Sequence, residues 1–185
     1  MTDIRTLKLP KTLVMVGMMG AGKTAIGRRI AARLGLSFVD ADDAIADAAG
    51  CSIEDIFERH GEAAFRDGER RVIERLLTAP VHILATGGGA FIDSQTRTRI
   101  LRDCLSVWLR VETDVLWRRV KRRTDRPLLQ TEAPYETLVK LVEKRYPIYA
   151  EADITVDSID GPAEDTVDSV LSAVAAHLRE EGKTV

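Results

Sequence analysis

Short apolar stretches alternate along the chain with longer segments in which apolar residues recur every three or four positions. The short stretches fit buried strands, and the longer ones fit helices that turn one apolar side toward a sheet. Strands and helices that alternate in this way are typical of a parallel sheet whose strands are joined by crossover helices. The five predicted strands are residues 13–16, 37–39, 81–85, 105–111 and 153–156.

Two local signals predict helix ends. Ile26 and Ile30 recur four residues apart, and Gly35 follows them, where a left-handed residue commonly ends a helix. Ser52 and Asp55 have the spacing of a capping box, in which each side chain bonds the other residue's backbone N–H. We therefore expect one helix between the first two strands and another that begins after Ser52.

The later part of the chain continues the helical pattern, with two interruptions. Gly61 should interrupt the helix that begins after Ser52, and a second helix should follow it. Residues 115–123 and 162–181 have helical periodicity, whereas residues 124–134 lose it and contain two prolines. We expect residues 124–134 to form a loop.

The composition fits one domain that spans residues 1–185, with residues 1–11 as an N-terminal arm. Of the 185 residues, 45% are hydrophobic and 30% are charged, which is enough apolar material for a core. A formal net charge of -2 gives no general attraction to polyanions, so we expect neither nucleic acid nor a membrane as a partner. Apolar runs stay well below the roughly 20 residues that cross a bilayer, and we expect a monomer in the cytoplasm.

Cysteine and histidine do not form a recognisable reactive or metal site. Cys51 and Cys104 lie far apart without CxxC spacing, and the three histidines are scattered. The chemistry of the chain should therefore come from other residues.

Residues 17–24, GMMGAGKT, match the GxxxxGK[ST] phosphate-binding pattern directly after a predicted strand and before a predicted helix. Backbone N–H groups and the helix N-terminus would hold phosphates there, with a positive charge from Lys23. The hydroxyl of Thr24 is suited to bind Mg²⁺. The alternative is a glycine-rich turn that binds nothing. We predict a nucleoside triphosphate and Mg²⁺ site whose contacts include Gly20, Ala21, Gly22, Lys23, Thr24 and Ala25.

Further candidates follow the second and third predicted strands, because ligands of an open parallel sheet bind outside the carboxyl ends of its strands. If the chain is extended there, Asp40 and Asp42 point to one side and could divide the binding of Mg²⁺ and an acceptor hydroxyl. Taken alone, the pair is better explained as a cap of the following helix. Residues 87–89, three glycines, could offer N–H groups to a ligand or simply form a tight turn.

Taken in order, these pieces resemble the shikimate kinase family from about residue 13 to residue 178. The matching segments are GMMGAGKT with the following IGR, FVDADD, DIFERHGEAAFRDGE, TGGGA, DRPLL and KRYPIY. Only the first is shared widely among phosphate-loop proteins. The resemblance implies an α/β fold of the P-loop NTPase type, with three layers and a five-stranded parallel sheet flanked by helices.

The resemblance also implies a reaction: transfer of phosphate from ATP to the 3-hydroxyl of shikimate, giving shikimate 3-phosphate and ADP in aromatic amino acid biosynthesis. Arg66 and Arg145 match arginines that grip the shikimate carboxylate. Asp42 matches the carboxylate that binds the substrate hydroxyls and acts as base, and Asp40 matches the one close to Mg²⁺. The remaining substrate contacts match the backbone of Gly87, Gly88 and Gly89.

The predicted loop at residues 124–134 coincides with the mobile lid of that family. Arg126 would close over the phosphates and complete a catalytic set with Asp42 and Lys23, while closure excludes water. Arg119 and Pro162 match residues that sandwich adenine, and Glu69 matches an acid that orients the first substrate arginine.

Three alternatives remain open at this point. The chain could be another small kinase of the same class, acting on gluconate or a nucleoside monophosphate. It could be a GTPase-like switch, although no NKxD motif is present, or a nucleotide-binding protein that has lost catalysis. Ala25 departs from the family, which often has a hydroxyl residue there, but the expected Mg²⁺ ligand Thr24 is kept.

Overall fold

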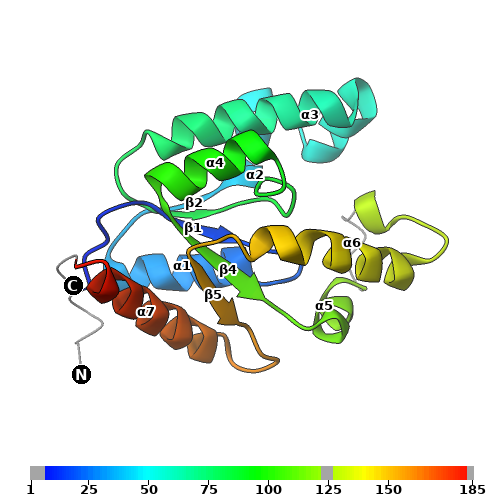
Figure 1. The fold of residues 1–185 in the computed structure, drawn as a ribbon. Coiled ribbons are helices and arrows are strands. Elements are labelled where there is room, and N and C mark those ends of the chain that lie inside the picture. Colours follow the sequence, from blue (N-terminus) through cyan, green and yellow to red (C-terminus); the bar gives the residue numbers. More distant parts are fainter. Residues whose placement is uncertain (1–6, 122–126, 183–185) are drawn as a thin grey trace.

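The computed structural model of the chain describes residues 7–121 and 127–182. Its centre is a five-stranded, all-parallel sheet with strand order β2-β3-β1-β4-β5 (Figure 1). All five predicted strands are confirmed, with ends that differ from the prediction by at most two residues. The strands are β1 Leu13–Val16, β2 Phe38–Asp40, β3 Ile83–Ala85, β4 Leu105–Arg110 and β5 Ile154–Asp157.

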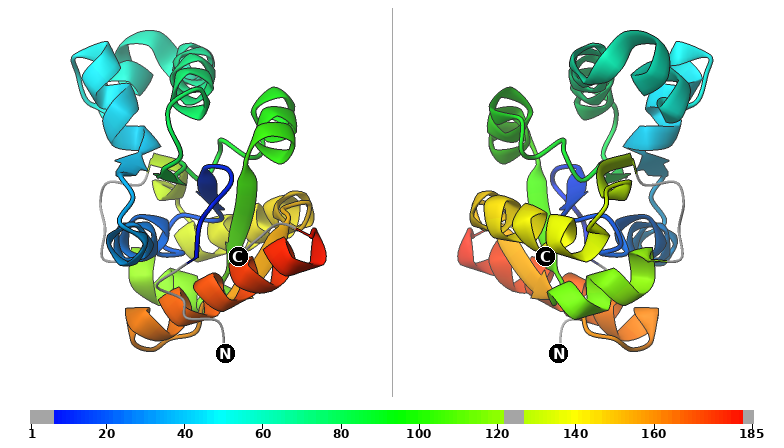
Figure 2. Two further views of the ribbon diagram at one scale, coloured as in Figure 1. Left: turned by 90° about the vertical axis from the view of Figure 1, so that its left-hand side faces the viewer. Right: turned by 90° about the vertical axis from the view of Figure 1, so that its right-hand side faces the viewer.

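Helices cover both faces of the sheet and make the three layers of the predicted fold class. α1 and α7 lie on one face, and α3 and α4 lie on the other (Figure 1). α2 and α3 pack together at one end of the molecule (Figure 2). The helices are α1 Lys23–Leu34, α2 Ala41–Ala49, α3 Ile53–Leu77, α4 Ser94–Asp103, α5 Thr113–Val120, α6 Pro134–Tyr149 and α7 Ala163–Glu180.

Two of these helices, α4 and α6, were not predicted. α4 buries only Thr96 and Ile100, so it lacks a continuous apolar stripe, and α6 contains Pro147 in its interior. The predicted loop at residues 124–134 is partly wrong, since Pro127–Leu129 form a 3-10 helix and Pro134 begins α6. Tertiary packing therefore stabilises helices whose own sequences signal them weakly.

The predicted signals at the C-terminal end of α1 and at the N-terminal end of α3 are confirmed. Gly35 ends α1 in the left-handed conformation, and Ser52 and Asp55 form the capping box of α3. Gly61 breaks α3 with φ 80 and ψ 174, a conformation that a side chain would strain. The break lets the two parts of α3 run in different directions beside α2.

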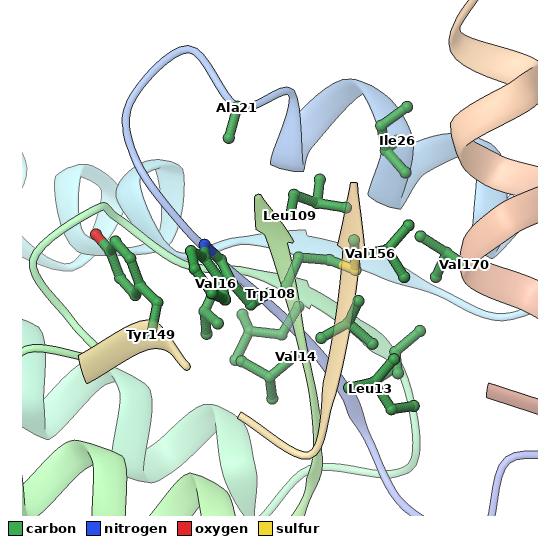
Figure 3. Close-up of a cluster of buried hydrophobic side chains, with 14 of the residues drawn as sticks. Leu13, Val14, Val16, Ala21, Ile26, Trp108, Leu109, Tyr149, Val156 and Val170 are labelled. Atoms are coloured by element: carbon green, nitrogen blue, oxygen red, sulfur yellow. The ribbon is translucent and has the colours of Figure 1, made fainter. Parts of the chain in front are cut away.

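The core lies between the sheet and its helices. All four residues of β1 are buried, because the strand is covered on both faces, and its apolar run is therefore continuous. Figure 3 shows Leu13 and Val14 of β1 with Trp108 of β4, Val170 of α7 and Tyr149 of α6. Each large apolar side chain buried in this way contributes about 1.5–3 kcal/mol. The core holds the carboxyl ends of the strands, where the polar residues gather, in a fixed arrangement.

In the described ranges 7–121 and 127–182, no helix combines the length and apolar character needed to cross a membrane.

Candidate active site

The phosphate-binding loop has the backbone shape that its glycines permit. Gly20 has φ 79, and at Gly17 the φ is 139 and an added Cβ would lie 2.9 Å from the carbonyl oxygen of Leu109. Gly22 caps α1 without a side-chain hydrogen bond, and the first turn of α1 has no acidic residue. The N–H groups and positive dipole end of α1 therefore face an open cavity that suits an anion.

Lys23 is folded over this loop. Its ammonium group donates to the carbonyl oxygens of Gly17 and Met18, each at 2.9 Å, and the side chain is buried. These bonds fix the positive charge at the mouth of the loop, where a phosphate of a bound nucleotide would lie.

A cavity of about 520 Å³, here called the nucleotide cavity, opens beside the loop. Arg119 bridges two parts of its wall by donating to the carbonyl oxygens of Gly20 at 3.3 Å and Ile159 at 3.1 Å. Pro162 caps α7 between the lining residues Gly161 and Ala163 but does not itself line the cavity. The structure thus brings Arg119 to the loop and places Pro162 one residue away from the wall.

Thr24 and Asp40 join the loop to the end of β2. The Thr24 hydroxyl donates to one carboxylate oxygen of Asp40 at 2.6 Å, and the other oxygen accepts from the backbone N–H of Asp42 at 3.0 Å. Asp40 therefore caps α2 while it faces the nucleotide cavity. The two alternatives weighed for this residue, cap and site residue, are compatible.

The expectation that Asp40 and Asp42 share one side of an extended chain is wrong. Asp40 is the last residue of β2, whereas Asp42 is the second residue of α2. The helix begins earlier than the sequence suggested, because Asp40 rather than Asp42 supplies the cap. Both aspartates still line the nucleotide cavity.

A second cavity of about 370 Å³, here called the acceptor cavity, adjoins the first. Arg66 of α3 and Arg145 of α6 both line it, although they are far apart in the sequence. Its lining also includes Ile53, Phe57 and Phe65. The residues common to both cavities are Met19, Asp42, Gly87 and Gly88.

Arg66 is held in place by acidic residues of its own helix. It donates to Glu69 at 2.8 Å and to Glu62 at 3.3 Å, and its guanidinium lies 5.1 Å from the centre of the Phe65 ring. Burial raises the pKa of Glu69, although Arg66 opposes this shift, and the charge of Asp42 raises it further. Burying the Glu69 carboxylate costs solvation free energy. In return, the carboxylate positions the guanidinium of Arg66 at the surface of the acceptor cavity.

Arg145 is held by the glycine turn after β3. It is buried and donates to the carbonyl oxygen of Gly88 at 3.4 Å. The hydroxyl of Tyr149, one turn further along α6, donates to the same oxygen. Burial raises the pKa of Tyr149 to about 12, so this hydroxyl remains a donor at neutral pH. The sequence reasoning missed Tyr149, and its only signal was its place four residues after Arg145.

Each glycine of the turn leaves room for a different site residue. An added Cβ at Gly87 would lie 2.9 Å from a carboxylate oxygen of Asp42, and one at Gly88 would lie 3.6 Å from a guanidinium nitrogen of Arg145. At Gly89 it would lie 2.4 Å from a guanidinium nitrogen of Arg66. Close side-chain approach therefore requires glycine at positions 87 and 89, whereas a Cβ at Gly88 would make only ordinary van der Waals contact.

Part of the predicted lid cannot be placed. Arg126 lies outside the described residues, as do residues 124 and 125 of the predicted lid segment. Of the remainder, Leu128 lines the acceptor cavity.

Comparisons with known proteins point to one family. The family model for shikimate kinase matches residues 19–175. The shikimate kinase of Rhodopseudomonas palustris is 54% identical over 168 residues, which cover 91% of this chain and 83% of the relative. That of Paramagnetospirillum magneticum is 53% identical over 178 residues, covering 96% of this chain and 91% of the relative.

Solved structures show the same fold. Shikimate kinase from Acinetobacter baumannii, in complex with shikimate, superposes with a TM-score of 0.87 and 36% identity, covering 94% of this chain and 96% of that one. A gluconokinase from Sinorhizobium meliloti 1021 shares the fold, with a TM-score of 0.63, 19% identity, and coverage of 94% of this chain and 97% of that one.

Proposed function

The chain belongs to the shikimate kinase family, and from this premise we propose how its two cavities transfer a phosphoryl group from ATP to the 3-hydroxyl of shikimate. The family uses ATP as co-substrate, and the reaction yields shikimate 3-phosphate and ADP in the shikimate pathway. The observation that carries the proposal is that Asp42 lines both cavities, so a single carboxylate faces both the donor and the acceptor.

Shikimate would enter the acceptor cavity with its carboxylate toward Arg66 and Arg145. A guanidinium can donate two parallel hydrogen bonds to a carboxylate, and two arginines from separate helices define its orientation. Their support by Glu69 and Gly88 keeps them in place before the substrate arrives. The backbone of Gly87, Gly88 and Gly89 would pass beside the sugar-like ring, where side chains would block it.

Asp42 would accept a hydrogen bond from the 3-hydroxyl and take its proton as the oxygen attacks the terminal phosphorus of ATP. ADP leaves from the opposite side, in line with the attacking oxygen. Phosphoryl transfer depends mainly on position and charge, so the residues act by holding the hydroxyl against the phosphate and by stabilising the transferred group. Lys23 stabilises that group from the loop, and we propose that Arg126 of the lid segment contributes a second positive charge to it.

The donor set beside the loop fits Mg²⁺. The Thr24 hydroxyl and the Asp40 carboxylate are oxygen donors that lie in contact, and Mg²⁺ prefers one or two such protein groups with water and phosphate oxygens. Among residues 7–121 and 127–182, no cluster of three or more His, Cys, Asp or Glu residues could form an all-protein cage. When bound, Mg²⁺ offsets the negative charge of the phosphates. Thr24 and Asp40 are the residues that would hold it.

Adenine would lie between Arg119 and the segment that leads into α7, which includes Pro162. Arg119 already contacts the loop and the carbonyl oxygen of Ile159 on this side of the cavity. We also propose that the enzyme acts as a monomer, because one chain lines both cavities, and that it acts in the cytoplasm, where ATP is supplied.

The test is ADP release by the purified chain with shikimate, gluconate or a nucleoside monophosphate as acceptor. We expect shikimate to raise the rate at least about 100-fold above the rate without an acceptor, because a correctly placed hydroxyl replaces water. A response to one of the other acceptors, with none to shikimate, would contradict the proposal.

A further inference from the structure

A third cavity, of about 550 Å³, lies between α2 and α3 and is separate from the two cavities of the reaction. We call it the α2–α3 cavity. Its floor is a second hydrophobic cluster composed of Ile45, Ile56, Phe65 and Val72. The volume lies within the range of about 300–1,000 Å³ that is usual for small-molecule sites.

Small residues make this cavity hollow. Ala48 and Ala49 of α2 face Ala64 and Gly68 of α3 across it. A Cβ added at Gly68 would meet no atom within 4 Å, so the helix has open space at this position. A larger side chain at Gly68 would therefore extend into the cavity without displacing its neighbours.

The rim of the cavity carries positive charge. Arg71 and Arg75 are exposed lining residues on α3, and His60 also lines the cavity. In the described part of the chain, Arg59, Arg66 and Arg70 of α3 have acidic partners within 4.0 Å, whereas Arg71 and Arg75 have none. Among residues 7–121 and 127–182, those that line the cavity include no aspartate or glutamate. A negatively charged group of a ligand would therefore complement the rim, and an apolar group would complement the floor.

We propose that the α2–α3 cavity binds a small monocarboxylic acid with an aromatic or branched aliphatic body. The body lies on Ile45, Ile56 and Val72, and the carboxylate is held by Arg71 and Arg75. Buried apolar contact and charge-assisted hydrogen bonds then act on opposite ends of one ligand.

The site is coupled to the reaction through Phe65, which lines both this cavity and the acceptor cavity. Its ring packs against Phe57 at 4.7 Å between centroids and supports the guanidinium of Arg66. A ligand against the opposite side of this ring changes the packing behind the substrate arginine. The KM for shikimate should therefore change while the KM for ATP stays the same.

The probe is 3-phenylpropanoate, whose affinity is measured by calorimetry. The double variant Arg71→Ala with Arg75→Ala should weaken binding at least about tenfold, since it removes charge-assisted bonds. Gly68→Leu should abolish binding by filling the cavity. Arg59→Ala is the matched control, because Arg59 is an exposed arginine of the same helix that does not line the cavity. Its affinity for the probe should equal that of the unaltered chain.

Cys51 reports the location of the bound probe. It is a partly buried lining residue, so occupancy should slow its alkylation by iodoacetamide at least about fivefold. Cys104 is the internal reference, because it is buried and burial raises the pKa of its thiol to about 11. The uncharged 3-phenylpropan-1-ol should protect Cys51 far less.

The outcomes separate the proposal from its alternatives. If the Gly68→Leu variant and the double-arginine variant bind the probe as tightly as the unaltered chain does, the probe binds elsewhere and the proposed site is overturned. Competitive displacement of the probe by shikimate would overturn it as well. Absence of measurable binding at about 10 mM probe, the range of very weak affinity, would do the same. Binding with no change in the KM for shikimate would overturn the coupling through Phe65. The binding and alkylation outcomes do not depend on the identity of the phosphoryl acceptor, because they are measured without turnover, whereas the coupling through Phe65 rests on the proposed function.

Discussion

Arg66 and Glu69 form an ion pair at 2.8 Å in which 23% of the arginine side chain is exposed but only 3% of the glutamate side chain. Glu69 therefore binds and orients Arg66 from the protein interior, while the guanidinium of Arg66 remains at the surface of the acceptor cavity. Burying such an ion pair costs solvation free energy, and what the pair contributes is a fixed orientation of the Arg66 guanidinium.

Glu69→Gln should raise the KM for shikimate about tenfold with a smaller change in kcat. The glutamine keeps the shape but loses the charge-assisted bond that orients Arg66, which is worth about 1.5–3 kcal/mol. Initial rates at varied shikimate and fixed saturating ATP measure the effect. A fall in kcat with unchanged KM would contradict a positioning role.

The same variant should also alter how stability depends on pH. Because burial raises the pKa of Glu69, the folded chain binds that proton more tightly than the unfolded chain. The resulting stabilisation is full below the ordinary value of about 4.3 and is lost as the pH rises through the folded-state pKa. The unfolding free energy of the unaltered chain, minus that of Glu69→Gln, should therefore decrease with rising pH in urea titrations. A difference that grows with pH would show that the ion pair outweighs burial.

Gly89→Ala should weaken shikimate binding and spare ATP binding. The added methyl group would lie 2.4 Å from a guanidinium nitrogen of Arg66, so the arginine must move out of its place. We expect the KM for shikimate to rise at least about tenfold, from loss of one charge-assisted contact. Gly68→Ala is the matched control, since its methyl group would meet nothing within 4 Å and alanine favours a helix. Equal KM values in the two variants would contradict the close approach.

Asp42→Asn should mainly lower kcat, whereas Arg145→Ala should mainly raise the KM for shikimate. The first change removes the group that accepts the hydroxyl proton, an effect of about 10²–10⁴ in rate, and the second removes a carboxylate contact. Steady-state kinetics on both variants distinguish the roles. Mild and equal effects would contradict both assignments.

Tyr149→Phe should loosen the glycine turn. The change removes one of two donors to the carbonyl oxygen of Gly88, and because Arg145 still donates to that oxygen, the loss is expected to cost about 0.5–1.5 kcal/mol of unfolding free energy. A modest rise in the KM for shikimate should accompany it, because Arg145 shares the same acceptor. Urea unfolding and initial rates together test this prediction. An unchanged KM for shikimate would show that the glycine turn does not influence substrate binding.

Local sequence was sufficient for much of the fold and for the phosphate loop. The strands, the cap at Ser52 and the break at Gly61 depend on residues close together in the chain, and the glycines of residues 17–24 set their own backbone. The signals are therefore readable without any knowledge of tertiary neighbours.

Tertiary structure alone decided how the acceptor cavity is assembled. Whether Arg66 and Arg145 meet depends on how α3 and α6 pack on the sheet, and the role of Tyr149 depends on a carbonyl group 61 residues away. The cap of α2 also differed from the expectation, since Asp40 had to satisfy both the helix and Thr24. The sequence by itself determined which residue types were available and where the backbone could turn. Packing determined which of them share a cavity, because contacts between distant segments are set by the whole core and not by local preference.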